Sequence, residues 1–171
     1  QAANAVVGDG SPASCTEAAF DTALTAASSG GGVITFNCGA AVHTIQFSVA
    51  KTVNLGNVTI NGGGRIVLAA GLNERHFFAG PVTFRLQNIT LQGGDSLVNG
   101  GAIESSGAQV ILENVQLLNN RSVVSGGAIY CYDGSLTIRD SRIADNQAAT
   151  GGAIFNDGCT LDIANTTFAS N

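Results

Sequence analysis

The sequence predicts an all-β solenoid, a single-stranded stack of about five β-coils with a short α-helix over its N-terminal end. The first observation is an internal repeat: the tetrapeptide Gly-Gly-Ala-Ile occurs three times, at intervals of 26 and 25 residues. The second is the alternation of apolar residues after each copy, which has the period of a strand and not of a helix. A repeat of this length indicates coils that bury their inner faces against their neighbours.

Composition supports the same fold. The chain has 23 glycines among 171 residues, which suits a backbone that turns every few residues. An apolar content of 44% and a mean hydropathy of +0.25 are enough for a continuous core. We therefore expect one domain over residues 1–171, with residues 1–32 as an N-terminal cap and residues 33–171 as the stacked coils.

The cap is expected to contain one amphipathic helix at about residues 15–28. Ser14 and Glu17 have the spacing of a capping box, and the three glycines at 30–32 end the helix. Such a helix would cover the open end of the stack, where backbone groups are unpaired. An ordinary surface helix is the alternative. The apolar residues on one helical face are Ala19, Phe20, Ala23, Leu24 and Ala27.

The coils begin with alternating strands at residues 33–36 and 43–47. The pattern then aligns Val53 with Phe84 and continues into the repeats, giving coil lengths of 31, 26, 26 and 25 residues. The longer early coil has room for a loop at residues 71–76. Stacking of the repeats predicts one interior row, formed by Ile103, Ile129 and Ile154.

Asparagines recur at matched positions and are expected at the turns between strands. Asn tolerates left-handed backbone angles, and its amide both donates and accepts hydrogen bonds. It can therefore bond coil to coil where a sharp bend leaves peptide groups unpaired. Some of these positions are also N-x-S/T sequons, but the repeat alone explains them. The predicted ladder residues are Asn114, Asp140 and Asn165 in one set, and Asn120, Asn146 and Asn171 in the other.

The four cysteines are expected to form two disulfides. Their spacing, with only two histidines in the chain, does not fit a zinc site. Cys131 and Cys159 occupy the same link in successive repeats, so stacking brings them close, and Cys15 then pairs with Cys38 by elimination. Four buried free thiols in a reducing cell are the alternative. Disulfides would indicate an extracellular or periplasmic compartment.

Two motifs resemble a known family. Each Gly-Gly-Ala-Ile is followed about fifteen residues later by an apolar-x-x-Asn box, at Leu117 to Asn120, Ile143 to Asn146 and Phe168 to Asn171. This pair resembles the repeat of the polymorphic outer membrane proteins. The opening segment from Val7 to Ala19, with residues 34–38 downstream, also looks like the N-terminal part of large secreted bacterial proteins with such repeats. The resemblance implies a right-handed parallel β-helix displayed on or secreted from a bacterial cell, often as an adhesin or surface-layer component.

Charge and hydropathy argue against two classes of partner. The net charge is −5 with a single lysine, Lys51, so the chain cannot build a phosphate-neutralising track for nucleic acid. The sequence also has no apolar run long enough to insert into a bilayer. We expect no cofactor and no metal.

A polysaccharide-active enzyme, a lyase or glycoside hydrolase, is the alternative function. A glycosidase needs two facing carboxylates roughly 5–9.5 Å apart. The expected outward columns are Glu113/Arg139/Ala164 and Gln116/Arg142/Thr167, which place no two acids side by side and predict an ion pair between Glu113 and Arg139. An ice-binding array would need a regular column of threonines, but we expect Thr59, Thr90, Gln116, Arg142 and Thr167. The cluster of Glu74, Arg75 and His76 fits a solvated loop as well as an active site.

The sequence therefore predicts a non-catalytic extracellular or cell-surface module with a structural or adhesive role. Two kinds of partner are expected: a host or matrix ligand, and another copy or subunit bound through the last coil at residues 151–171, unless further coils follow there. Tyr130 and Tyr132 flank Cys131 and would form a small aromatic patch if both face outward.

Overall fold

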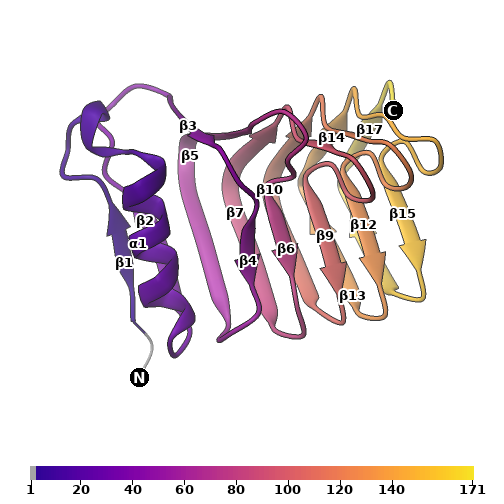
Figure 1. Cartoon of the computed structure of the whole chain (residues 1–171), viewed down its shortest axis with the longest axis horizontal. Helices are drawn as coiled ribbons and strands as arrows, with labels where there is room; N and C mark the ends of the chain where they lie inside the picture. The colour runs from indigo at the N-terminus through magenta and orange to yellow at the C-terminus, as the bar shows by residue number, and fades with distance from the viewer. Residues whose placement is uncertain (1–2) are drawn as a thin grey trace.

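The computed structural model describes residues 3–171 as a right-handed parallel β-helix of about six turns, with 53% strand and 9% helix. Figure 1 shows the helix α1 (Glu17–Ser28) at one end of the stack and the most C-terminal coil at the other. The sequence predicted this fold class, although it counted about five coils. The additional turn lies near the cap, where the repeat is least regular.

The larger sheet contains ten of the strands in the described part of the chain, and all its pairings are parallel. Its main path runs from the cap along the whole stack. The strands on this path are β1 (Ala5–Val7), β2 (Gly32–Phe36), β5 (Val58–Ala70), β7 (Thr83–Gln92), β10 (Gln109–Leu118), β13 (Ser135–Arg139) and β16 (Thr160–Ala164). The strands beside the path are β3 (His43–Phe47), β14 (Arg142–Ala144) and β17 (Thr167–Ala169).

A second parallel sheet forms the opposite wall, facing the viewer in Figure 1. Its strands are β4 (Lys51–Val53), β6 (Phe77–Ala79), β9 (Ile103–Ser106), β12 (Ile129–Tyr132) and β15 (Ile154–Asp157). Two short strands, β8 (Asp95–Ser96) and β11 (Arg121–Ser122), pair with each other. Along the chain, each follows a strand of the larger sheet and precedes a strand of the second sheet.

The core is a set of straight interior rows. Ile103 pairs in register with Ile129, and Ile129 with Ile154. The first two side chains are fully buried, and Ile154 is partly buried against the core. The larger sheet supplies the facing rows, in which Val110 pairs with Leu136 and Leu136 with Leu161. Like residues lie over like, so each coil buries its inner face against the coils next to it.

The register of the early coils differs from the sequence alignment. Val58, and not Val53, pairs with Phe84, so this coil is 26 residues long instead of 31. The irregularity lies within β5, where residues 62–65 stand opposite the single residue Asn88. Val53 belongs to the second sheet, next to Ala79. Three extra residues in β5 thus shift the apparent repeat, and the loop at 71–76 lies within a coil of ordinary length.

Steric limits explain the Gly-Gly-Ala-Ile motif. The first glycine of each copy has a left-handed φ of +58° to +68°, and a Cβ there would collide with the carbonyl of the isoleucine in its own motif. The second glycine lies against the next coil: a Cβ on Gly101 or Gly127 would meet the carbonyl oxygen of Gly127 or Gly152. The following alanine and isoleucine point into the core. The motif is therefore the tightest bend of each coil.

One asparagine set forms a continuous ladder, of which Asn120 and Asn146 are buried. Asn120 Nδ2 donates to Asn146 Oδ1 at 3.0 Å, and Asn146 Nδ2 donates to Asn171 Oδ1 at 2.7 Å. Asn120 and Asn146 also donate to the carbonyls of Leu91 and Leu117. We expected the ladder asparagines themselves to have left-handed backbone angles. Instead, the residue before each of them is left-handed, with φ of 52° to 58° at Asn119, Asp145 and Ser170.

The other set is left-handed but bonds over only part of its length. Asn114, Asp140 and Asn165 have φ of 50° to 53°. Asn114 Nδ2 donates to Asn88 Oδ1 at 2.8 Å, and Asn88 Nδ2 donates to Asn61 Oδ1 at 3.1 Å. Within the described residues this run stops at Asn114, because an aspartate has no side-chain N–H to continue the run of amide hydrogen bonds at position 140. Asn61 takes the place that the alignment gave to Asn57.

The cap helix begins at Glu17, and Thr16 is its N-cap. The Thr16 hydroxyl accepts from the Ala19 amide at 3.2 Å. The predicted box of Ser14 and Glu17 is wrong, since Ser14 Oγ accepts from the Asp9 amide in the preceding turn, which contains the short 3-10 helix at Pro12–Ser14. Phe20 packs with Phe47 at a ring-centroid distance of 4.9 Å. Phe20, Ala23, Leu24 and Ala27 are buried, so the helix covers the end of the core.

Lys51, the first residue of β4, forms ion pairs with two carboxylates of this helix. Its ammonium lies 2.7 Å from Glu17 Oε1 and 2.8 Å from Asp21 Oδ1, and its side chain is only 5% exposed. Burial opposes ionisation of Glu17, but hydrogen bonds from Lys51 and Ser48 outweigh it and lower the pKa of Glu17 to about 2. The Glu17 carboxylate is thus charged at neutral pH.

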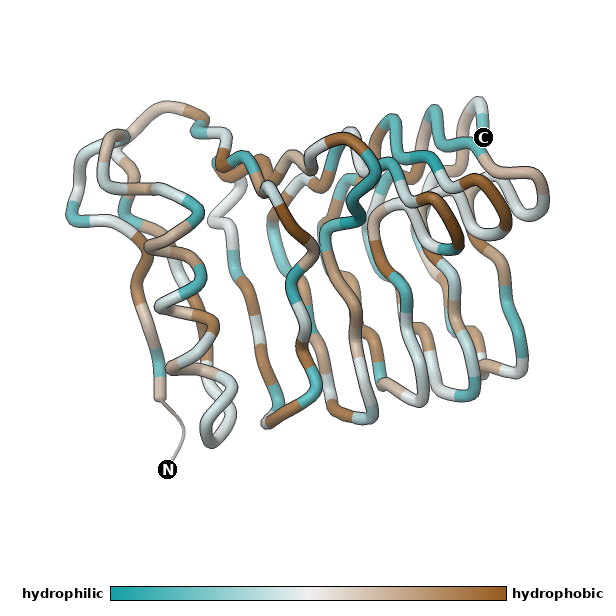
Figure 2. The backbone as a smooth tube through the Cα atoms, in the orientation of Figure 1, coloured by the Kyte–Doolittle hydropathy of each residue, from teal (hydrophilic) through white to brown (hydrophobic). Residues whose placement is uncertain are grey.

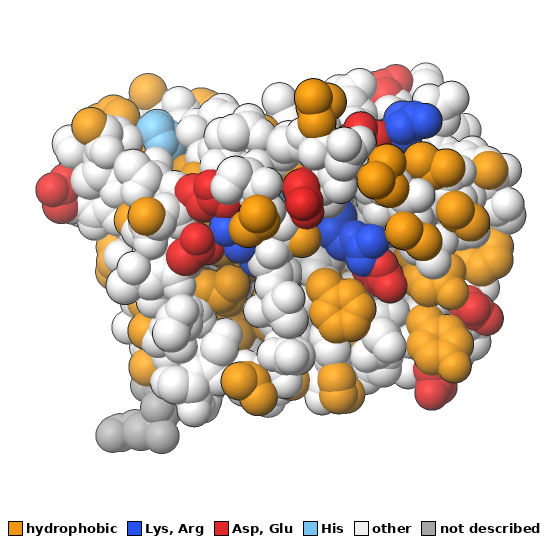
Figure 3. Space-filling model, in the orientation of Figure 1, with side chains coloured by type: hydrophobic (Ala, Val, Ile, Leu, Met, Phe, Trp, Pro, Cys, Tyr) orange, Lys and Arg blue, Asp and Glu red, His pale blue; other side chains and the backbone are white. Residues whose placement is uncertain are grey.

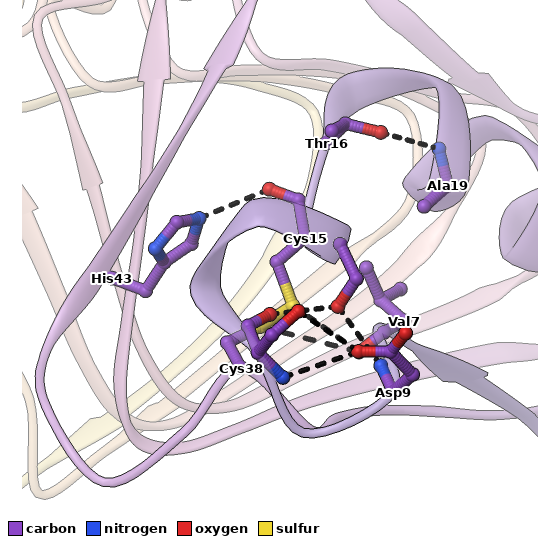
Figure 4. Close-up of a disulfide and its surroundings, with 9 residues drawn as sticks. Val7, Asp9, Cys15, Thr16, Ala19, Cys38 and His43 are labelled. Atoms are coloured by element: carbon purple, nitrogen blue, oxygen red, sulfur yellow. Dashed lines mark hydrogen bonds between the residues drawn. A yellow bond between two sulfur atoms is a disulfide. The ribbon is translucent and has the colours of Figure 1, made fainter.

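Both predicted disulfides are present, Cys15–Cys38 and Cys131–Cys159. Figure 4 shows the first, which joins the turn before α1 to the end of β2, with His43 Nε2 at 3.0 Å from the Cys15 carbonyl. The second joins Cys131 on β12 to Cys159 in the link between β15 and β16 of the next coil, and both cysteines are buried.

Removing the second disulfide is expected to destabilise the stack. The double change Cys131→Ala and Cys159→Ala should lower the free energy of unfolding by about 3 kcal/mol, because the bond closes a loop with a sequence separation of 28. Urea unfolding of the two proteins under oxidising conditions measures this. Non-reducing peptide mapping is the control, and a Cys15–Cys131 link or free thiols in the native protein would contradict the pairing.

Candidate functional site

The carboxylates on the larger sheet are held by arginines. Glu113 and Arg139 are register neighbours, as predicted, but Glu113 forms its ion pair with Arg85 at 2.9 Å and accepts from Gln87 at 2.7 Å. These bonds, first from Gln87 and then from Arg85, lower the pKa of Glu113. Arg139 instead contacts Asp162 of the next coil. The expected Glu113–Arg139 pair is therefore wrong, because each group has an alternative partner in an adjacent coil.

The outward column that was predicted to contain Thr59, Thr90, Gln116, Arg142 and Thr167 also differs from its prediction. Val67, and not Thr59, is the register neighbour of Thr90, and the column continues through Gln116, Arg142 and Thr167. Thr59 pairs with Arg85. The column mixes apolar, amide, basic and hydroxyl groups.

The cluster of Glu74, Arg75 and His76 is divided among three structural contacts. Glu74 Oε2 accepts from the Ala50 amide, and Arg75 pairs with Glu104 and Ser96. His76 is fully buried, with Nε2 at 2.9 Å from the Leu68 carbonyl. Burial lowers the pKa of His76 to about 4 despite backbone hydrogen bonds that favour the charged form. The three side chains therefore do not converge on one site.

His76 is expected to make stability depend on pH. Its pKa is lower in the folded protein than the ordinary value of 6.5, so the unfolded chain binds more protons between the two values. The free energy of unfolding should be highest above pH 6.5 and fall by roughly 3 kcal/mol as the pH drops to about 4. Urea titrations at several pH values test this. The variant His76→Gln should show a flatter profile over the same range, and an unchanged slope would contradict the assignment.

The solvent side of the second sheet carries a row of large side chains. Register pairing places Thr52, Phe78, Glu104, Tyr130 and Phe155 in one outward column, one residue per coil. Tyr132 lies in the next outward column beside it and is 49% exposed. We call this surface the aromatic face. Figure 3 views it directly, with apolar side chains over β6, β12 and β15 and basic and acidic groups between them.

The side chains of the aromatic face are ordered by one another. The rings of Tyr130 and Phe155 are parallel within 3°, with centroids 5.7 Å apart. The Tyr130 hydroxyl donates to Asp157 Oδ2 at 2.9 Å, and this bond raises the pKa of Tyr130. The ion pair of Arg75 and Glu104 lies between Phe78 and Tyr130. Tyr130, Phe155 and Glu104 are therefore held in place by contacts within the protein.

A hollow of about 370 Å³ lies at the cap end of this row. Thr52 belongs both to the outward column and to the lining of the hollow, so the two features are continuous. Leu24 and Leu55 give the hollow an apolar surface, and Leu55 is 67% exposed. The polar lining groups are Thr25, Ser28, Ser29, Thr52 and Asn54. An apolar surface with a few polar groups around it is the usual character of a ligand site.

Two smaller hollows lie on the larger sheet. One of about 150 Å³ is lined by Asn88, Thr90, Asn114 and Gln116, beside the bend. Another of about 90 Å³ lies at the 62–65 loop, near Cys38. Both are too small for more than a few waters or a small polar group.

Exposed apolar residues also gather in two other places. Leu97, Val98, Val123 and Val124 are 43–57% exposed in loops after β8 and β11, and Figure 2 shows these loops with strongly hydrophobic tips. The inward positions of the last described coil, Leu161, Ile163 and Phe168, are 37–44% exposed.

Sequence reasoning found Tyr130 and Tyr132 but missed Phe78, Phe155, Thr52 and the hollow. Aligning the residue after each motif isoleucine would have placed Glu104, Tyr130 and Phe155 in one column. The hollow had no such signal, because it depends on how α1 lies against β4.

Comparison with known proteins gave no match to any family model, curated protein or solved structure. In residues 3–171 no helix has the length and apolar character needed to cross a membrane. Within the same residues, no group of three or more His, Cys, Asp or Glu side chains is placed to hold a metal ion. The fold and the aromatic face are thus the basis for a functional assignment.

Proposed function

We propose that this protein is a non-catalytic extracellular or cell-surface module of bacterial type, with a structural or adhesive role. The observation that carries the proposal is the aromatic face, a column with half-buried rings on both sides of Glu104 that ends at a hollow beside α1. Aromatic residues gathered on an exposed surface are characteristic of binding sites. The motif resemblance to polymorphic outer membrane proteins agrees with this role.

The two disulfides support the compartment. Such bonds persist in oxidising environments and are rare in the cytosol. A stack fastened at the cap and at the second sheet would hold its surface in shape outside the cell.

The state of the carboxylates favours binding over catalysis. Glu17, Glu104 and Glu113 are each paired with a lysine or an arginine. The pKa values of Glu17 and Glu113 are lowered, whereas a general acid at neutral pH needs a raised pKa. These groups are suited to holding the coils together.

A binding assay combined with a turnover assay tests the proposal. The oxidised chain, immobilised on beads, is offered matrix proteins and matrix polysaccharides, and bound material is quantified by mass and by size. We expect retention of at least one component with its chain length unchanged. Shortening of a bound polysaccharide would overturn the non-catalytic assignment, and retention of none would overturn the adhesive one.

Self-association is the second part of the proposal. Leu161, Ile163 and Phe168 on the last described coil are exposed although they continue the interior rows, which would suit contact with another copy. Sedimentation velocity over a range of concentrations tests this, with Phe168→Ser as the variant. A monomer at all concentrations would contradict it.

A further inference from the structure

We propose that the aromatic face binds an uncharged, extended glycan chain that lies along the solenoid axis with one end in the hollow beside α1. This inference rests on the proposed adhesive function and specifies its ligand. The chain would run over the outward column from Thr52 to Phe155.

The distribution of aromatic residues is the first argument. The chain has eight Phe, two Tyr and no Trp. Five phenylalanines pack in or against the core, namely Phe20, Phe36, Phe47, Phe77 and Phe84. Four of the other five rings, including both tyrosines, are on the aromatic face: Phe78, Tyr130, Tyr132 and Phe155. Solvent-facing rings are not needed to fill a coil of this fold, so their concentration on one face indicates recognition.

The shape of the row is the second argument. It is one side chain wide and advances by one strand spacing per coil, so it spans roughly 19 Å over four steps of about 4.8 Å. A narrow row of side chains that repeats along one axis suits a linear polymer whose units also repeat along one axis. It is too narrow for a standard protein interface, which needs about 800 Å² on each partner.

An extended peptide is the other linear candidate, but it binds sheets in a different way. Peptides add to a sheet edge through unpaired backbone groups. The strands under the row are paired on both sides, since β9 and β12 each lie between two neighbours. The exposed groups are side chains, and a ligand must be recognised through apolar ring surface and hydroxyls.

Saccharide units have the matching chemistry. A β-linked sugar ring has an apolar C–H face and a polar rim of hydroxyls. The parallel rings of Tyr130 and Phe155 offer apolar surface to the first. The hollow offers both kinds of contact, with Leu24 and Leu55 beside the hydroxyls of Thr25 and Ser28.

Charge selects among glycans. Glu104 is paired with Arg75, and Asp157 accepts from Tyr130, while Asp133 follows Tyr132 in the chain. The face therefore has no unpaired cation among its described residues, and the whole chain has a net charge of −5. A polyanionic glycan would be repelled, so a neutral one is favoured.

The test measures binding of defined hexasaccharides by titration calorimetry. Cellohexaose and chitohexaose, neutral and extended, are the probes. Maltohexaose, which is neutral but curved, and hexagalacturonate, which is anionic, are the controls. We expect one or both extended hexamers to bind, with affinity rising as the same sugar is lengthened from two to six units. Preference for either control, or no binding of the extended hexamers, overturns the inference.

Variants locate the site. The double change Tyr130→Thr and Phe155→Thr removes both rings but places residues of high strand propensity on β12 and β15, and it should weaken binding by roughly tenfold or more. Thr25→Trp fills the hollow and should weaken binding of the hexamer more than of the trimer. Val42→Ala, a 67% exposed apolar residue before β3, is the matched control and should bind like the parent. Unchanged affinity in folded Tyr130/Phe155 variant protein overturns the location.

The outcomes separate this inference from the proposed function. Retention of a matrix protein by the beads, with no hexasaccharide bound, rejects the glycan ligand and leaves the adhesive role. Failure of both experiments rejects both.

Discussion

Replacing Gly127 with alanine is expected to lower the free energy of unfolding by about 3 kcal/mol or more. A Cβ at this position would collide with the carbonyl oxygen of Gly152 and lie 2.6 Å from the Gln147 amide nitrogen. All these atoms are backbone, so no side chain can rotate to relieve the contact. Two neighbouring coils would have to separate, and their hydrogen bonds would lengthen.

Urea unfolding followed by circular dichroism measures this effect. Gly64→Ala is the matched control, because Gly64 has a left-handed φ of +75° but no atom within 4 Å of its Cβ position. It should cost only the strain of the backbone angle, about 1 kcal/mol. Similar losses at Gly64 and Gly127 would contradict the predicted clash between neighbouring coils at Gly127.

The second large effect is expected for Asn146→Leu, with a loss of roughly 3–5 kcal/mol. Asn146 Oδ1 accepts from both the backbone amide and Nδ2 of Asn120, and its own Nδ2 donates to the Leu117 carbonyl. Leucine has a similar volume but leaves these buried groups without partners. Each unpaired buried group costs about 1–3 kcal/mol.

Equilibrium unfolding again provides the measurement. The exposed Asn57, whose Oδ1 accepts only from the Thr83 amide in the described structure, supplies the comparison. Asn57→Ala should lose less than about 1 kcal/mol. A double-mutant cycle with Asn120→Leu should give a large coupling energy, since both residues belong to one ladder. Additive losses would argue against a cooperative ladder.

The regular part of the fold could be predicted because its constraints act locally and repeat. Gly-Gly-Ala-Ile fixes one bend in each coil, so the positions of Ile103, Ile129 and Ile154 follow from counting, as does the proximity of Cys131 and Cys159. The early coils lack this marker. Val53 and Val58 both begin alternating apolar runs. The extra residues in β5 made the run from Val53 align with Phe84, although Val58 is its true register neighbour.

Contacts between side chains were harder to predict than the register. A residue in a solenoid has neighbours in the coil before it, in the coil after it and on the diagonal. Glu113 contacts Arg85 and Gln87, and not its register neighbour Arg139. Thr16 and Ser14 are both good N-caps by residue type, so the sequence alone could not decide between them, and Thr16 is the one used. The hollow of the candidate site depends on the docking of α1 through Lys51, which no sequence pattern encodes.

The Cys131–Cys159 bond has a mechanical consequence for a stack in which each coil contacts mainly its neighbours. Tension applied at Asn171 would peel strands β17 and β16 away one hydrogen bond at a time. At Cys159 the load would pass through the covalent bond to Cys131, so residues 132–158 would not be extended. The bond would therefore shorten the length of chain that tension can draw out of the stack.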